Sequence, residues 1–167
     1  MASVGVRRNA AWLTLFAGFL SVLALVCTTL RPPSDADLVL QFTRDSANYQ
    51  RVITMLTADT NIGTIDPGFL WHVEKPFHDA SAAQVGIPEM RLAEYRRILG
   101  ALGVIRLDRW ARDQVMFATW ARGFGGNTHH RGIAWLYVPA SSIGWRRFQV
   151  IAAPWYIRGL GSGGEAA

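Results

Sequence analysis

The chain has 167 residues, of which 50% are hydrophobic, and 17 basic residues against 12 acidic ones give it a net charge of +5. No run of basic residues is longer than two, which excludes the basic stripe typical of nucleic-acid-binding proteins. Cys27 is the only cysteine, so no disulfide forms within the chain and no cysteine-based metal site or nucleophile lies elsewhere in it.

The first element is an uncharged run over residues 10–30, which is 21 residues long. A helix that crosses a bilayer needs about 20 apolar residues, so this run predicts a transmembrane helix. Arg7 and Arg8 precede it, whereas Asp35 and Asp37 follow soon after it. Because positive charge marks the cytoplasmic side, we expect a single-pass protein of the cell inner membrane with its N-terminus in the cytoplasm. The C-terminal domain is then extracytoplasmic.

Two alternatives concern the same N-terminal segment. The small residues of Ser34-Asp35-Ala36 fit a signal-peptidase site, and cleavage there would release a secreted protein. Cys27 could instead carry a lipid anchor. With the anchor uncleaved, the chain divides into a cytoplasmic N-terminus (1–9), the membrane helix (10–30), a linker (31–36), an extracytoplasmic domain (37–158) and a flexible tail (159–167).

Two helices are expected in the domain. The first runs from about Ala36 to Ala58 and is capped by Asp35 or Asp37, because its apolar residues recur at helical spacing. Those residues form a stripe typical of core packing: Leu38, Phe42, Tyr49, Val52, Ile53 and Leu56. The second helix is expected over Pro88–Leu102, ending at Gly100 or Gly103. Its apolar face consists of Leu92, Tyr95, Leu99 and Leu102.

The segment between the two helices is rich in turn signals. Asn61-Ile62-Gly63 and Asp66-Pro67-Gly68 are both typical of turns. Ile62–Ile65 and Phe69–Val73 fit short strands beside them, and we expect a loop over Lys75–Gly86.

After Val104 the apolar period changes from helical spacing to two. Val115, Phe117 and Thr119 alternate with Met116, Ala118 and Trp120, and Ile133, Trp135 and Tyr137 alternate with Ala134, Leu136 and Val138. Phe148–Ile151 and Trp155–Ile157 predict a hairpin around Ala152-Ala153-Pro154. Helices first and strands last predict an α+β fold in which two main helices pack on one face of an antiparallel meander of three to five strands.

The charge is unevenly divided along the chain. Residues 31–87 carry 4 basic and 7 acidic residues, and residues 88–167 carry 11 basic and 5 acidic ones. A basic C-terminal half could face anionic lipid or an acidic partner. The simpler interpretation is a dispersed set of solvated arginines.

The stretch GIPEMRLAEYRRILGALGV, over residues 86–104, resembles a segment of small bacterial membrane-anchored proteins of unknown function. In those proteins a Y-R core leads into L-G, and a K/R-G-I-A-Y/W strand and a later W-Y strand follow. Arg131–Leu136 and Trp155–Ile157 match these strands. Ala152-Ala153-Pro154 departs from the polar turn expected between them. The resemblance implies an anchor with an α+β domain, and it implies no activity, cofactor or site residue.

No group of residues predicts a catalytic, cofactor or metal site. The adjacent pair His129-His130 lacks the spacing of a zinc site, and His72 and His78 could join it only through folding. Other weak candidates are a Ser-His-Asp arrangement through Ser141 or Ser142, carboxylate pairs, and a glycine-rich phosphate loop. The carboxylates are Asp59, Asp66, Glu74 and Asp79, and the loop glycines are Gly123, Gly125 and Gly126.

Aromatic residues are numerous in the domain. The set that draws attention is Trp110, Trp120, Trp135, Trp145, Trp155, Tyr137 and Tyr156, of which Trp120 or Tyr156 is expected to be exposed. Exposed rings beside Arg122, Arg146 and Arg147 would suit a partner or a lipid interface, and burial against a helix is the alternative. The sequence therefore favours a single-pass membrane protein of the envelope that acts by contact with the membrane or an envelope protein. The alternative is a small envelope hydrolase that uses His129 and His130.

Overall fold

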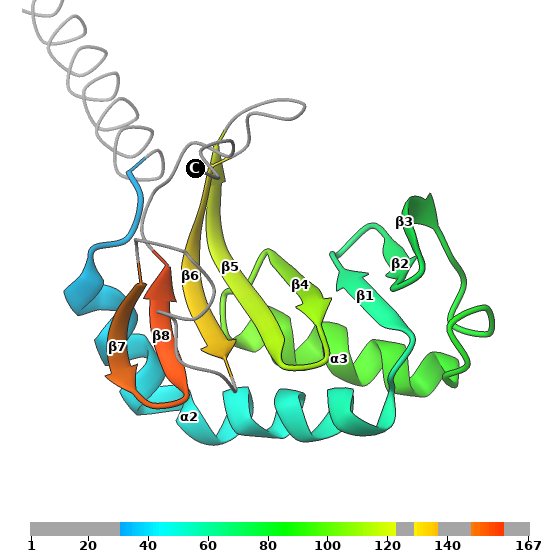
Figure 1. The fold of residues 1–167 in the computed structure, drawn as a ribbon, viewed down its shortest axis with the longest axis horizontal. Coiled ribbons are helices and arrows are strands. Elements are labelled where there is room, and N and C mark those ends of the chain that lie inside the picture. The colour runs from blue at the N-terminus through cyan, green and yellow to red at the C-terminus, as the bar shows by residue number, and fades with distance from the viewer. Residues whose placement is uncertain (1–30, 123–128, 137–147, 159–167) are drawn as a thin grey trace, which may run out of the picture. The chain divides into compact units, whose positions relative to one another are not determined.

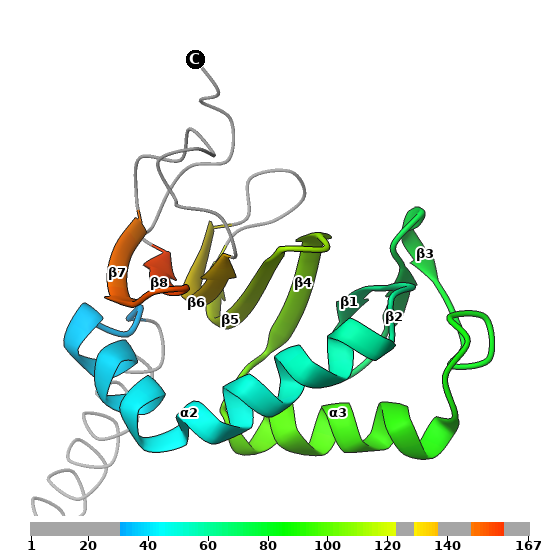
Figure 2. The ribbon, with the colours of Figure 1, turned by 60° about the horizontal axis from the view of Figure 1, so that its bottom comes forward.

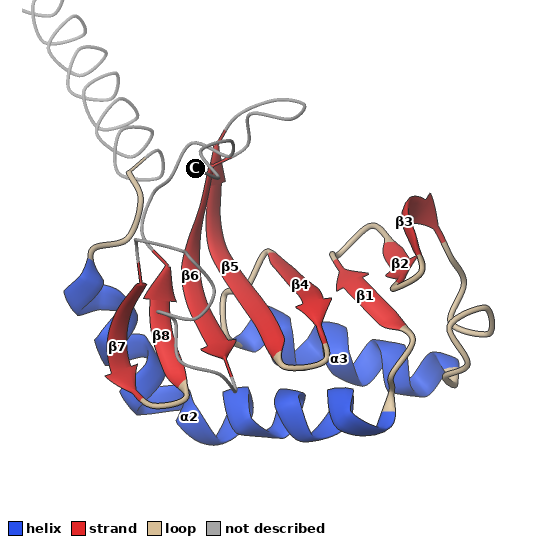
Figure 3. Ribbon diagram, in the orientation of Figure 1, coloured by secondary structure: helices blue, strands red, loops and turns tan. Residues whose placement is uncertain are grey.

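The computed structural model describes residues 31–122, 129–136 and 148–158, and the compact unit that holds the described helices and strands begins at Pro33. These residues form two helices and one antiparallel sheet (Figures 1 and 3). The elements in chain order are α2 (Asp35–Ala58), β1 (Ile62–Ile65), β2 (Leu70–His72), β3 (Lys75–Asp79), α3 (Glu89–Ala101), β4 (Arg106–Ala111), β5 (Gln114–Arg122), β6 (His129–Leu136), β7 (Phe148–Ala152) and β8 (Trp155–Arg158).

Both helices lie where the apolar spacing predicts them. The N-cap of α2 is Ser34, not an aspartate: its hydroxyl accepts from the backbone N–H of Asp37, whose carboxylate accepts from the backbone N–H of Ser34 at 2.9 Å. This reciprocal pair is a capping box. Helix α3 ends at Ala101, and Gly103 follows its C-cap Leu102 with a φ of +62°, while Val104 N–H donates to the Leu99 carbonyl at 2.9 Å. Such an ending needs the conformational freedom of glycine.

The sheet has eight strands in the order β3-β2-β1-β4-β5-β6-β8-β7. The expected meander of three to five strands is therefore wrong. Strand β4 has Arg106, Asp108 and Arg109 in its sequence, which hides the apolar alternation. Strand β3 falls within the loop expected over Lys75–Gly86, and it is exposed along its whole length, so it leaves no apolar pattern. The pairing of β1 with β4, across α3, joins segments too far apart for sequence patterns to connect.

Both helices cover the same face of the sheet (Figure 2). The six apolar residues predicted for the α2 stripe are all buried there. Alternate strand residues point into this core, including Leu70, Leu107, Phe117 and Ile133. The intervening residues lie on the opposite face, where Met116, Ala118, Ala134, Leu136 and Tyr156 form a second buried cluster.

The expected fold also included a transmembrane helix, and the expected class of protein was a membrane protein. Neither described helix is both long and apolar enough to cross a membrane, so for the part of the chain that the structure describes this expectation is wrong. The prediction itself fell on residues 10–30, which lie outside the described residues together with the expected N-terminus at 1–9 and tail at 159–167.

Candidate functional site

The four histidines do not form one site. His72 and His78 are on β2 and β3, whereas His129 and His130 are on β6, four strands from β2 in the sheet. Neighbouring strands are spaced by about 4.8 Å, so the two pairs lie about 19 Å apart or more. Among the described residues no group of three or more His, Cys, Asp or Glu side chains is placed to hold a metal ion.

Three of the four candidate carboxylates accept hydrogen bonds within the fold. Asp66 accepts from Gly68 N–H within its turn, and Asp79 accepts from Leu70 N–H between neighbouring strands. Asp59 lies at the end of α2, and Glu74 lies in the turn between β2 and β3. None of them lines either of two hollows in the described surface. Ser141, Ser142 and the glycines Gly123, Gly125 and Gly126 lie outside the described residues.

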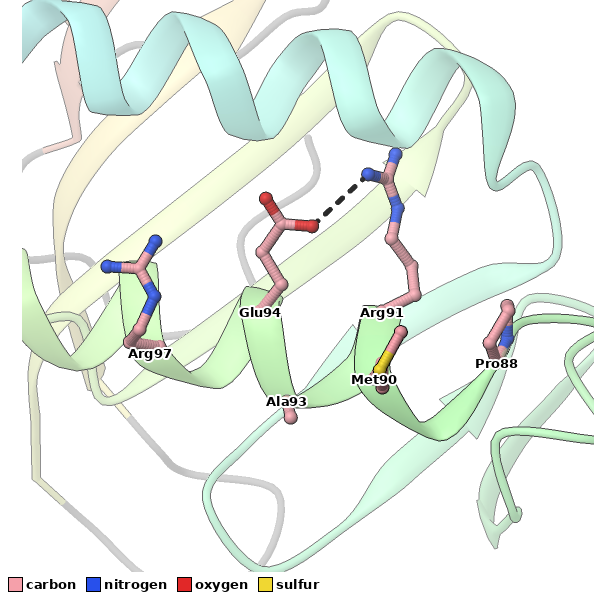
Figure 4. Close-up of a pocket in the computed structure, with 6 residues that line it drawn as sticks. All are labelled: Pro88, Met90, Arg91, Ala93, Glu94 and Arg97. Carbon is pink, nitrogen blue, oxygen red and sulfur yellow. Dashed lines mark hydrogen bonds and ion pairs between the residues drawn. The ribbon is translucent and has the colours of Figure 1, made fainter.

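A shallow, open hollow in the described surface lies along α3. Its lining is Pro88, Met90, Arg91, Ala93, Glu94 and Arg97, which all belong to that helix or its cap. In Figure 4 the side chains of Arg91, Glu94 and Arg97 extend toward α2, while Met90 and Ala93 point elsewhere. Arg91 pairs with Glu94 at 3.4 Å within α3, and Glu94 also pairs with Arg51 of α2, which bridges the two helices. One exposed helix face without a second wall is a poor place to enclose a ligand.

A polar network joins α2, α3 and β4. The carboxylate of Asp59 accepts from the Tyr95 hydroxyl at 2.8 Å and from Arg91 Nε at 2.9 Å. Burial and this contact with Asp59 raise the pKa of Tyr95. The buried guanidinium of Arg109 donates to the Leu56 carbonyl at 3.0 Å, and burial lowers its pKa. Because every member has a protein partner, we interpret the network as structural.

The predicted aromatic residues lie in several environments. Trp155 and Tyr156 are buried, so the expected exposure of Tyr156 is wrong, while Trp120 is half-buried. Trp135 packs against the core and Trp110 is partly exposed on β4. Tyr137, Trp145, Arg146 and Arg147 lie outside the described residues.

Another set of aromatic residues forms a cluster that the sequence patterns did not reveal. Phe69 stacks on Trp71 with ring centroids 4.9 Å apart, and Phe77 lies 5.0 Å from Trp71. The guanidinium of Arg106 lies 4.9 Å from the Trp71 ring centroid and 5.8 Å from that of Phe69. We call these four residues the aromatic corner. Leu70 and Leu107 point into the helix-covered core, so the neighbouring Trp71 and Arg106 lie on the opposite face of the sheet.

Buried polar contacts hold the corner in place. Arg106 Nε donates to Asp108 Oδ1 at 2.8 Å, and the same oxygen accepts from the Thr64 hydroxyl at 2.8 Å. Thr64 and Asp108 are both buried, and they face each other on neighbouring strands. Side chains of β1 and β4 therefore fix the orientation of the Arg106 guanidinium over the rings.

Phe77 is the most unusual residue of the corner. Its side chain is 80% exposed, although its ring contacts Trp71. Its φ is +68°, in the left-handed region that residues other than glycine and asparagine rarely adopt. An exposed ring in a costly backbone conformation does not stabilise the core. Its role must therefore be sought at the surface.

The corner lies at one end of the sheet, where β3 is the edge strand (Figure 1). Trp71 pairs with Asp79 and His72 pairs with Lys75, so residues 76–78 bulge out of the ladder. Sequence reasoning could have found Phe69 and Trp71 from their alternation with the buried Leu70. It could not have found Arg106, which reaches them from β4, two strands away.

Searches of protein-family models, curated proteins and solved structures found no match to this chain. The resemblance to membrane-anchored proteins stays a prediction. The geometry of the corner is thus the main guide to function.

Proposed function

We propose that this domain acts by contact with another protein, and that the aromatic corner is the contact surface. The observation that carries the proposal is the 80% exposed side chain of Phe77, held on Trp71 in a left-handed backbone conformation. Aromatic and arginine side chains contribute most of the binding energy at many protein interfaces. The aromatic corner supplies both kinds of side chain in one patch, with three rings and a guanidinium that Asp108 holds in place.

The extracytoplasmic location belongs to the same proposal and rests on Arg7 and Arg8 before the uncharged run of residues 10–30. The partner is accordingly sought in the cell envelope. Hydrolysis has less support, because the described histidines and carboxylates are spread over separate elements or occupied locally.

Site-directed photo-crosslinking tests the proposal. A photo-reactive phenylalanine analogue replaces Phe77 in the full chain, in cells that naturally produce it. Matched controls place the analogue at Met90 on α3 or at Leu40 on α2, which are 84% and 68% exposed. We expect a discrete crosslinked protein from position 77 that is missing from positions 90 and 40. Equal yields at the three positions, or no adduct at position 77, would contradict the proposal.

A further inference from the structure

We infer that the protein segment recognised at the aromatic corner is basic, and that it places an arginine or lysine side chain against the exposed ring of Phe77. This inference rests on the proposed function and adds the chemical class of the partner. Three features carry it: the corner already holds a guanidinium, its rim is acidic, and its edge strand is unsuited to backbone pairing.

The rings of the corner already bind a cation from within the chain. The guanidinium of Arg106 lies 4.9 Å from the centroid of Trp71. An aromatic face attracts a cation because the ring quadrupole is negative above its plane. Cation–ring contacts among the described residues include those of Phe69, Trp71 and Tyr95, and no described cation lies over Phe77. Its exposed ring is the surface on which a second cation, from a partner, would find the same chemistry.

The segment that carries Phe69, Trp71 and Phe77 is acidic. Asp66 lies in the turn that leads to Phe69, Glu74 lies in the turn between β2 and β3, and Asp79 pairs with Trp71. Lys75 is the single basic residue between Asp66 and Asp79, so this segment has a net charge of −2. The charge of Arg106 is balanced by Asp108 at 2.8 Å. A rim of one sign steers a partner of the opposite sign and disfavours acidic partners.

The edge strand itself is unsuited to the addition of a strand from a partner. Pro76 has no backbone N–H to donate, and residues 76–78 bulge away from β2. Proline and bulges at a sheet edge hinder pairing with another chain. The partner is therefore recognised by its side chains, which makes their charge the property that decides binding.

The test uses the full-length chain and synthetic peptides. The probe is a short Gly-Ser peptide with three arginines, and the comparison peptides carry citrulline or glutamate at the same positions. Citrulline keeps the planar shape of arginine but has no charge, because a carbonyl oxygen replaces one of the guanidinium nitrogens. Binding is followed by isothermal titration and by tryptophan fluorescence at low salt. We expect the arginine peptide to bind at least about tenfold more tightly than either comparison peptide, with affinity falling as salt rises.

Variants link that binding to the corner. Phe77→Ala should weaken binding of the arginine peptide by about threefold, which is the loss of one exposed cation–π contact. The double variant Asp66→Asn, Glu74→Gln should weaken it by about fivefold, through the loss of two exposed charges. Asn at position 66 retains an oxygen that can accept from Gly68 N–H, so the turn is kept. Glu89→Gln, on the exposed start of α3, is the matched control and should leave affinity unchanged.

The outcomes separate this inference from the proposed function. Crosslinking at position 77 together with equal affinity for the arginine, citrulline and glutamate peptides would overturn the basic partner but leave the contact surface standing. Preference for the glutamate peptide would also overturn it. Arginine-selective binding that is unchanged in Phe77→Ala and in the double variant would show a basic-peptide site elsewhere, and the inference about the corner would fail.

Discussion

Gly132 occupies a position on β6 where a side chain has no room. A Cβ atom built there would lie 2.0 Å from the Phe117 carbonyl oxygen and 3.0 Å from the Ala118 Cα. These are backbone atoms of β5, the neighbouring strand, so relief requires the two central strands to separate. We expect Gly132→Ala to destabilise the domain by about 2–4 kcal/mol, in the range of severe core changes.

Urea unfolding of Gly132→Ala measures this cost, and Gly100→Ala is a suitable control. Gly100 is on α3, and an alanine Cβ at this position would meet no neighbouring atom within 4 Å. Alanine favours a helix over glycine by about 1 kcal/mol, so this control should be neutral or stabilising. Equal stability of the two variants would contradict the close approach of β5 and β6.

Tyr49 predicts a dependence of stability on alkaline pH. Its side chain is fully buried, and the structure gives its hydroxyl no hydrogen-bond partner among the described residues. Burial raises the pKa of this hydroxyl well above its ordinary value of 10.0. The unfolded chain therefore loses the Tyr49 proton above pH 10 while the folded chain keeps it, and stability falls by about 1.4 kcal/mol per pH unit from this group.

Tyr49→Phe removes that loss. We expect its stability relative to the natural chain to be neutral or up to about 1 kcal/mol higher at pH 8, since an unsatisfied polar atom is removed. The advantage should grow by about 1 kcal/mol between pH 10 and pH 11. Tyr95→Phe is the contrast, because the Tyr95 hydroxyl donates to Asp59 at 2.8 Å and its loss should destabilise the domain at pH 8. Parallel urea titrations that show no divergence above pH 10 would contradict the account of Tyr49.

At the scale of elements, a side chain from β4 donates hydrogen bonds to the backbone carbonyls at the C-terminal end of α2. The last turn of α2 contains no basic residue. Arg109 supplies the missing donors, with Nη1 3.0 Å from the Leu56 carbonyl and 3.4 Å from the carbonyls of Asp59 and Thr60. We expect Arg109→Met to cost about 1–3 kcal/mol, because it leaves the buried Leu56 carbonyl without this donor.

Hydrogen exchange locates that loss. In Arg109→Met the amides of the last turn of α2 should exchange faster relative to the rest of the helix. Arg112→Met is the control, because Arg112 is exposed in the turn after β4 and should change stability by less than about 0.5 kcal/mol. A loss of stability that is equal in the two variants would mean that total charge, not this cap, is responsible.

The same scale shows what sequence patterns can and cannot reveal. The helices and strands with one buried apolar face, such as α2 and β5, were predicted because periodicity records burial directly. Strand β3 has no buried face, and β4 carries charged residues such as Arg109 whose partners lie on another element. Their periodicity is lost, so the sheet was predicted with too few strands.

The candidate site was missed for a related reason. Phe77 lies in the segment expected to be a loop, where an aromatic residue gives no regular pattern. Arg106 reaches Phe69 and Trp71 only through the pairing of β1 with β4. The cluster is built from three segments that are separated in the sequence. Only the pairing of the strands brings them together, so no local spacing of residues predicts it.

At the scale of the whole domain, the first helix and the last strand share one aromatic core. Trp155 on β8 lies 5.0 Å from the Phe42 ring and 5.9 Å from the Tyr49 ring, both on α2. It also lies 6.0 Å from Phe117 on β5. Residues near the two ends of the described domain are thus held together by buried side chains, so α2 and the sheet should unfold as one unit.

Trp155→Ala tests this coupling. Loss of a buried tryptophan costs about 3–5 kcal/mol, which is a large part of the roughly 5–15 kcal/mol that stabilises a typical domain. We expect the helix signal by circular dichroism and the tryptophan fluorescence to change at the same, lowered urea concentration. Trp155→Phe should lose less, and Met90→Ala should lose nothing measurable because its side chain is 84% exposed. If α2 kept its helix signal while the fluorescence reported an unfolded sheet, the shared core would not be what couples the two ends of the domain.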